Sequence, residues 1–252
     1  MDASKSWIVR PKVKLQTPLL RLFCLPYAGG SASMFYTWST RLPAEVEVCA
    51  VQLPGRERRL NESPFTCLPP LVQALASALQ PYLDVPFAIF GHSTGAIVSF
   101  ELIRQLRREK APAPQYLFVS ARRAPQLPAT EPPIHQLPDA AFIEKLRRYQ
   151  GTPEAILRDE KIMEIVMPTL RADLALNETY VYNSEPPIDC PISAFGGLQD
   201  REVSRDDLSL WRDQTTSHFT LQMFPGNHFF LHSEVEALLS VISQDLHSIL
   251  PV

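Results

Sequence analysis

The stretch FAIFGHSTGA, residues 87–96, carries the strongest structural signal in the sequence. A short apolar run leads directly into Gly91-His92-Ser93-Thr94-Gly95, which fits the pattern G-x-S-x-G, and the segment 95–110 that follows is typical of a helix. A strand that turns sharply into a helix is the setting in which this pattern places a nucleophilic serine. Glycines two residues before and after the serine relieve the crowding of such a turn. A serine that only capped the helix would not need both glycines, so we predict that Ser93 is a nucleophile.

Apolar runs alternate with helical segments on both sides of this stretch. The alternation favours a mainly parallel sheet with helices on both faces. Together with the serine motif, it predicts an α/β-hydrolase fold for residues 19–252, preceded by a flexible tail, 1–18, that is polar and aperiodic. The expected strands are 19–25, 46–53, 87–90, 116–121, 191–197 and 219–225, and the expected helices are 31–42, 68–83, 95–110, 204–215 and 231–249.

The alternation stops between about residues 122 and 182. This segment shows no convincing strand, only helical stretches near 138–149, 153–166 and 168–182 that prolines separate. Proline in a helical pattern usually ends the helix. We therefore expect an inserted helical unit, and an insertion late in such a sheet commonly acts as a lid over the site.

Composition excludes several classes of function. A net charge of −3 over 252 residues gives no basic footprint, so nucleic acid is not expected as a partner. The first twenty residues lack the apolar core of a signal peptide, and no run approaches the roughly 18 apolar residues of a membrane span. The four cysteines are far apart without a CxxC pair, which favours free thiols over disulfides or zinc ligands. We expect a cytoplasmic protein that does not associate with membranes.

A nucleophilic serine needs a base, and the base needs a carboxylate that orients it. In this fold both partners follow the serine along the chain, in loops after strands. His228 lies in such a loop, in FPGNHFF, directly after the last expected strand. Asp200 follows the strand PISAFGG, with Glu202 as a near competitor. We predict a catalytic triad of Ser93, Asp200 and His228.

The charge that develops on the substrate oxygen needs two backbone N–H donors. Thr94, the residue after the nucleophile, supplies one in this fold. The loop after the first long strand, PYAGG, supplies the other, and its glycines allow the backbone to approach a ligand. We assign Ala28 and Thr94 as the oxyanion-hole donors, although a Gly-Gly pair that only makes a tight turn is the alternative.

Several stretches taken together resemble the type II thioesterases, the stand-alone editing enzymes of non-ribosomal peptide and polyketide synthases. The resemblance runs from about residue 19 to 249 and is far more specific than GHS-x-G alone. The stretches that carry it are FCLPYAGGSASMFYTW (23–38), LPGRERR (53–59), FAIFGHSTGA (87–96), RADLALNETYVY (171–182), FGGLQDREV (195–203) and MFPGNHFFL (223–231).

The resemblance implies an enzyme that hydrolyses acyl groups from the phosphopantetheine arm of acyl or peptidyl carrier proteins, without a metal or organic cofactor. The family's nucleophile, acid and base match Ser93, Asp200 and His228, and its oxyanion donors match Ala28 and Thr94. The family usually has methionine where this chain has Thr94, which leaves the acyl preference open. An esterase or lipase of the same fold and a non-catalytic binding scaffold are the alternative functions.

Carrier proteins are generally acidic, so a basic docking face is one hypothesis. The arginines at 56, 58 and 59, or those at 104, 107 and 108, could form it, although charged runs on helices are more often solvated faces. Arg171 and Asp173 could fix the position of the lid. We expect the enzyme to act as a monomer.

Overall fold

The computed structural model describes residues 6–11 and 18–250. Its centre is a seven-stranded sheet in the order β1-β3-β2-β4-β5-β6-β7, in which only β1 runs antiparallel to its neighbour. The predicted mainly parallel sheet is therefore confirmed. The strands are β1 Ile8–Val9, β2 Leu20–Leu25, β3 Val46–Val51, β4 Phe87–His92, β5 Tyr116–Ser120, β6 Ile192–Gly197 and β7 Phe219–Phe224.

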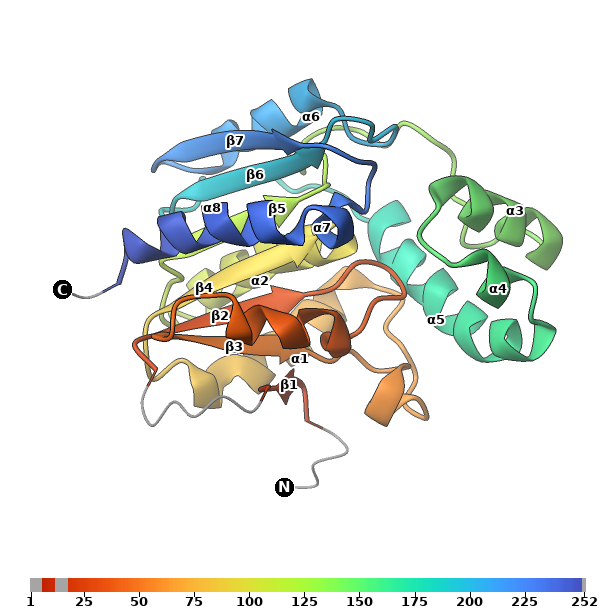
Figure 1. Ribbon diagram of the computed structural model, residues 1–252, viewed down its shortest axis with the longest axis horizontal. Helices are drawn as coiled ribbons and strands as arrows, with labels where there is room; N and C mark the ends of the chain where they lie inside the picture. The colour runs from red at the N-terminus through yellow and green to blue at the C-terminus, as the bar shows by residue number, and fades with distance from the viewer. Residues whose placement is uncertain (1–5, 12–17, 251–252) are drawn as a thin grey trace.

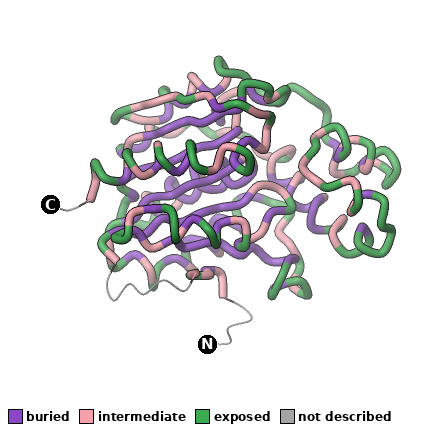
Figure 2. Tube along the Cα trace, viewed as in Figure 1, coloured by how far each residue is buried: buried purple, intermediate pink, exposed green. Residues whose placement is uncertain are grey.

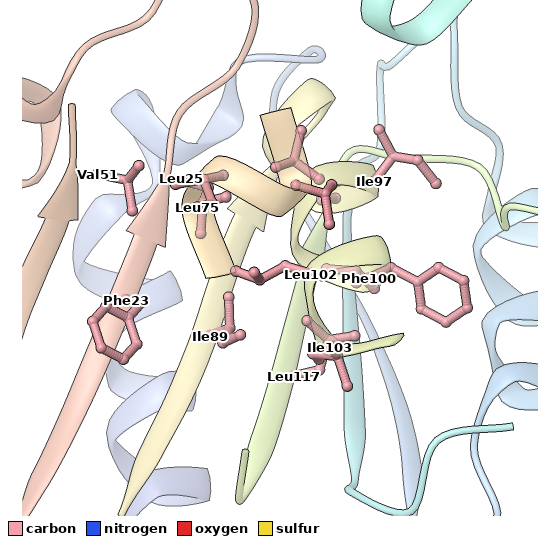
Figure 3. Close-up of a cluster of buried hydrophobic side chains, with 14 of the residues drawn as sticks. Phe23, Leu25, Val51, Leu75, Ile89, Ile97, Phe100, Leu102, Ile103 and Leu117 are labelled. Carbon is pink, nitrogen blue, oxygen red and sulfur yellow. The ribbon is translucent and has the colours of Figure 1, made fainter. Parts of the chain in front are cut away.

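Helices cover both faces of the sheet (Figure 1). On one face, β2, β4 and β5 pack against α1 (Leu68–Leu79) and α2 (Thr94–Arg108), and Figure 3 shows their side chains meeting. On the other face, the same strands pack against the 3-10 helix η2 (Ala32–Thr40) and α8 (Val235–His247). Because both faces are covered, the central strands are buried along their length (Figure 2).

Several predicted elements differ in detail from those observed. The helix expected over 204–215 is a short α6 (Arg205–Ser209) followed by a 3-10 segment, η5 (Leu210–Gln214). The final helix is divided into α7 (Phe230–Ser233) and α8, because Glu234 between them leaves helical geometry. Among the described residues, no helix is long and apolar enough to span a membrane.

The first described residues do not match the predicted tail. Ile8 and Val9 form β1, which pairs antiparallel with β3, and the Ile8 side chain is buried. A two-residue strand is too short to show an alternating pattern, which explains why the sequence did not reveal it. The rest of the predicted tail, residues 1–5 and 12–17, lies outside the described residues.

The segment between β5 and β6 contains three helices, which lie beside the sheet at the end where the strand arrows point (Figure 1). They have a small apolar core of their own, which includes Phe142, Leu146, Met163 and Leu170. One prediction was wrong, because the last helix continues through Pro168 instead of breaking there. The helices are α3 Asp139–Tyr149, α4 Glu154–Leu157 and α5 Glu160–Glu178.

Candidate active site

Ser93 occupies a strained turn between β4 and α2. Its backbone has φ 53° and ψ −113°, a conformation that side chains rarely adopt. The turn is tight on both sides: a Cβ on Gly91 would lie 2.2 Å from the carbonyl oxygen of Gly95, and one on Gly95 would lie 2.3 Å from that of Leu25. Both positions therefore require glycine, as the sequence motif indicated.

The loops after β6 and β7 are held together directly beyond the sheet. A Cβ on Gly197 would lie 2.4 Å from the carbonyl oxygen of Asn227, so only glycine allows this approach. The N–H of Gln199 donates to the carbonyl of Gly226 at 2.9 Å. This contact brings the loop that carries Asp200 against the loop that carries His228, although 28 residues separate the two along the chain.

The structure places Asp200 and His228 in direct contact. His228 Nδ1 lies 2.8 Å from Asp200 Oδ2, and the Asp200 side chain is fully buried. Its other oxygen, Oδ1, accepts the N–H groups of Glu202 at 2.8 Å and Val203 at 3.3 Å. An ionised carboxylate only accepts, so Nδ1 of His228 carries the hydrogen and Nε2 is left as the free base.

Ser93 and His228 line the same cavity, whose volume is about 310 Å³. Ala28 lies on its wall, and the inserted helices supply apolar side chains such as Leu146 and Leu170. The cavity therefore places the polar groups of Ser93 and His228 beside apolar side chains of the insertion. Such a combination suits a ligand with a reactive polar centre and an apolar tail.

The amides assigned to the oxyanion hole are available as donors. Within the residues that the structure describes, the N–H groups of Ala28 and Thr94 donate to no acceptor. Thr94 is the first residue of α2, where a backbone N–H has no partner inside the helix. Ala28 lines the cavity together with Ser93, and Thr94 directly follows Ser93 along the chain, but the role of both amides remains a prediction.

A family model described as a thioesterase domain matches residues 20–246. The chain belongs to the thioesterase family. The gramicidin S biosynthesis protein GrsT of Aneurinibacillus migulanus is 46% identical to it, over 97% of this chain and 95% of the relative. Thioesterase PikA5 of Streptomyces venezuelae is 38% identical over 90% of this chain and 81% of its own length.

Solved structures agree with this assignment. The RedJ thioesterase from the prodiginine pathway of Streptomyces coelicolor is 41% identical and has a TM-score of 0.85, with 90% of each chain covered. The type II thioesterase BorB from the borrelidin biosynthetic cluster is 35% identical and has a TM-score of 0.86, with 95% of this chain and 97% of that chain covered. The predicted α/β-hydrolase fold and the resemblance to type II thioesterases are thereby confirmed.

Helix α5 of this thioesterase is tied to the main body by a buried ion pair. Arg56 donates to both oxygens of Asp173, at 2.6 and 2.8 Å, and both residues are at least 93% buried, being 7% and 2% exposed. Arg171, which the sequence grouped with Asp173, instead bonds the carbonyl of His135 and the carboxylate of Asp139 within the insertion. Asp173 therefore joins the insertion to the segment after β3, and Arg171 stabilises the insertion itself.

Replacement of Arg56 by methionine is expected to destabilise the thioesterase by about 3–5 kcal/mol, because the buried carboxylate of Asp173 loses its countercharge. Chemical denaturation measures this as a fall in the free energy of unfolding. The neighbouring Arg58 is exposed and serves as the control, since Arg58→Met should change stability by less than about 0.5 kcal/mol. Equal stabilities of the two variants would contradict the proposed importance of the pair.

The structure does not support the hypothesis of a basic docking face. Arg59 is buried and bonded to Glu62, and Arg104 is buried and bonded to Glu101. Glu185 makes ion pairs to the arginines at 104, 107 and 108. Three of the six arginines, those at 56, 59 and 104, are therefore buried and paired, and those at 107 and 108 share the carboxylate of Glu185, so neither group presents a run of unpaired positive charge.

His92, next to the nucleophile, is buried behind the site. Its Nδ1 lies 2.8 Å from the hydroxyl oxygen of Ser120, and its ring centre is 5.5 Å from that of His228. Burial lowers the pKa of His92 well below its ordinary 6.5, and the charges that His228 and His232 can carry lower it further. His92 is therefore neutral in the folded enzyme, and its ring packs against that of His228.

This lowered pKa predicts how stability depends on pH. The unfolded chain binds a proton at residue 92 near pH 6.5 and the folded enzyme does not, so the free energy of unfolding falls as the pH drops below 6.5. The loss from this group is at most about 1.4 kcal/mol per pH unit. Unfolding of His92→Gln between pH 7 and 5 should show a smaller slope than the parent enzyme. An unchanged slope would mean that His92 is not buried in its neutral form.

Proposed function

We propose that this thioesterase hydrolyses acyl groups from the phosphopantetheine arm of carrier proteins, with Ser93, His228 and Asp200 as its catalytic triad. One observation carries the proposal: Ser93 and His228 line one cavity, and His228 is bonded to the buried carboxylate of Asp200. The choice of substrate is supported by related proteins, among them ClbQ from the colibactin NRPS/PKS pathway and the type II thioesterase YbtT from the yersiniabactin NRPS/PKS pathway.

In the first half of the reaction the acyl group moves to the enzyme. His228 Nε2 takes the proton of the Ser93 hydroxyl as the serine oxygen attacks the thioester carbonyl carbon. Asp200 holds the imidazole through Nδ1 and stabilises its positive charge. The carbon–sulfur bond then breaks, the pantetheine thiol leaves with a proton from His228, and an acyl-serine ester remains.

In the second half a water molecule replaces the thiol. His228 removes a proton from the water as it attacks the ester carbonyl, and then returns this proton to the Ser93 oxygen as the acid departs. In both halves a negative charge develops on the carbonyl oxygen. The N–H groups of Ala28 and Thr94 are the donors for this charge, and the loss of one such donor typically lowers turnover by roughly 10²–10³-fold.

The insertion serves as the lid of this site in the proposed function. Its residues Leu146, Leu170 and Leu174 line the cavity, so they bound the space that the acyl chain occupies. The lid would thereby set the acyl size and the entry of the pantetheine arm. Disulfide cross-linking of the lid to the main body should slow hydrolysis of carrier-bound substrate more than hydrolysis of a small acyl thioester.

The experiment that tests the proposed function compares matched substrates. The same acyl group is presented on a phosphopantetheinylated carrier protein, as a small thioester and as an oxygen ester, and kcat/KM is measured for each. We expect the carrier-bound thioester to exceed the oxygen ester by at least about tenfold, since the carrier contributes binding energy that the small ester lacks. A preference for oxygen esters would identify an esterase, and absence of turnover together with absence of fluorophosphonate labelling at Ser93 would identify a binding scaffold.

A further inference from the structure

Helix α5 contacts both loops that supply the proposed oxyanion-hole donors. Asp173 and Asn177 lie one helical turn apart on the same face of α5. Asp173 Oδ2 accepts the N–H of Gly29 at 2.7 Å, and Asn177 Nδ2 donates to the Thr94 hydroxyl oxygen at 2.5 Å. One helix of the insertion is thus bonded to the loop after β2 and to the first turn of α2.

In the loop after β2, hydrogen bonds fix the peptide planes on both sides of Ala28. The carbonyl of Tyr27 accepts the N–H of Gly30 at 2.9 Å. Because the peptide is planar and trans, fixing this carbonyl also fixes the direction of the Ala28 N–H. The next peptide is held through the N–H of Gly29, which donates to Asp173. The orientation of the first donor therefore depends in part on a side chain of α5.

The packing of α5 against this loop is also close. Gly29 has φ +76°, and a Cβ there would lie 2.5 Å from the Leu170 side chain of α5. Asp173, which holds Gly29, is itself fixed by its two hydrogen bonds to Arg56. A buried carboxylate held by a guanidinium has little freedom to leave its partner. The contact between α5 and the loop is therefore rigid.

The second contact is directional because a third residue orients the amide. Arg122 Nη1 donates to Asn177 Oδ1 at 3.2 Å, so the NH₂ group of Asn177 faces Thr94. The carbonyl of Arg122 accepts the indole N–H of Trp211 at 2.7 Å, which holds the arginine backbone. Thr94 is 2% exposed, and its hydroxyl has Asn177 as its hydrogen-bond partner among the described residues. The hydrogen bonds therefore run from Arg122 through Asn177 to Thr94, the residue whose N–H is the second proposed donor to the oxyanion.

We propose that Asp173 and Asn177 are positioning residues for the oxyanion hole, through which helix α5 holds both donors in place. This inference rests on the proposed function, since it takes Ala28 and Thr94 as the donors. Loss of the α5 contacts would remove the hydrogen bonds of Asp173 and Asn177 together, and with them part of the support of each N–H group. Thr94, where the resembling family usually has methionine, is the residue through which this chain makes the second link.

A double-mutant cycle at Thr94 and Asn177 tests the inference. Thr94→Val keeps the shape of the side chain and removes its hydroxyl, and Asn177→Leu removes the donor. We expect each variant to lower kcat by roughly tenfold, a fraction of the cost of losing a donor outright, with KM changed by less than about twofold. The double variant should be no slower than either single variant, because both remove the same interaction.

Two controls separate positioning from general stability. Thr94→Ser retains the hydroxyl and should keep most of the parent activity, and Glu164→Ala changes an exposed residue of the same helix and should leave kcat unchanged. An acyl trifluoromethyl ketone, which forms an oxyanion on Ser93, should lose affinity for Thr94→Val by the same factor as kcat/KM falls. A general loss of structure would not lower the affinity for the ketone and kcat/KM by the same factor.

The outcomes also separate this inference from the proposed function. If a fluorophosphonate fails to label Ser93 in the parent enzyme, the proposed function fails and the inference falls with it. If Ser93 is labelled but the two variants act multiplicatively, or the ketone binds Thr94→Val as tightly as the parent, only the inference is overturned. Thr94→Val keeps the test valid even where Asn177→Leu fails to fold.

Discussion

Replacement of Ser93 by alanine is expected to lower kcat for a carrier-bound acyl thioester by roughly 10⁶-fold, the scale seen when a serine nucleophile is removed. The expectation follows from the position of Ser93 on a strained turn, beside a cavity that it shares with His228. Without the hydroxyl no acyl-enzyme forms, and only direct attack by water remains. Single-turnover hydrolysis of a radiolabelled acyl carrier measures rates this slow.

The Ser93→Ala variant must also fold normally for this result to be interpreted. Alanine adds no bulk at the turn, so the thermal midpoint should remain within about a degree or two of the parent value. Ser99, which is buried in α2 and donates to the carbonyl of Gly95, provides a matched control. Ser99→Ala should retain activity, and a Ser93→Ala enzyme with more than about 1% of the parent rate would exclude Ser93 as the nucleophile.

Replacement of Asp200 by asparagine is expected to lower kcat by roughly 10⁴-fold, as wrong-tautomer variants of serine hydrolases do. The oxygen that replaces Oδ1 must still accept the N–H groups of Glu202 and Val203, so the new NH₂ group faces His228 Nδ1. Nδ1 must then accept, which places the imidazole hydrogen on Nε2. A histidine in this tautomer cannot take the proton of Ser93.

The control for Asp200 lies in the same loop. Glu202 keeps much of its surface in solvent, but the part of its carboxyl group that loses water on folding, together with the charge of Glu131, raises its pKa. It was the near competitor for the acid of the triad, but its carboxylate makes no hydrogen bond to His228. Glu202→Gln should therefore keep kcat within about threefold of the parent. A larger loss for Glu202→Gln than for Asp200→Asn would reassign the acid.

The parts of the fold that the sequence predicted correctly have local causes. Gly91 and Gly95 indicate a tight turn without information from the rest of the chain. The strands are apolar runs that end at or near glycine or proline. Helix α5 has no such local cause, since Pro168 lacks an N–H and normally ends a helix. Met163 and Leu170, on either side of the proline, are buried in the same apolar cluster, and this packing outweighs the lost hydrogen bond.

The contacts of the site were less predictable, because they join distant segments. Arg56 and Asp173 are 117 residues apart along the chain. Nothing in the sequence around either residue indicates that the two form an ion pair. The two groups of arginines therefore suggested a basic surface from the sequence, although the structure pairs most of them with carboxylates. Asn177 was not singled out at all, since a single asparagine in a helical segment has no distinctive pattern. Only the docking of α5 against α2 shows what it contacts.

The most direct test of the account is the capture of the acyl-enzyme. The thioesterase is mixed with a carrier protein that bears an isotopically labelled acyl group, quenched with acid within milliseconds, digested and analysed by mass spectrometry. The account predicts a transient acyl mass on the peptide that contains Ser93, at a level that rises and decays with product formation. Turnover at the full rate with the label on another residue, or on none, would contradict it.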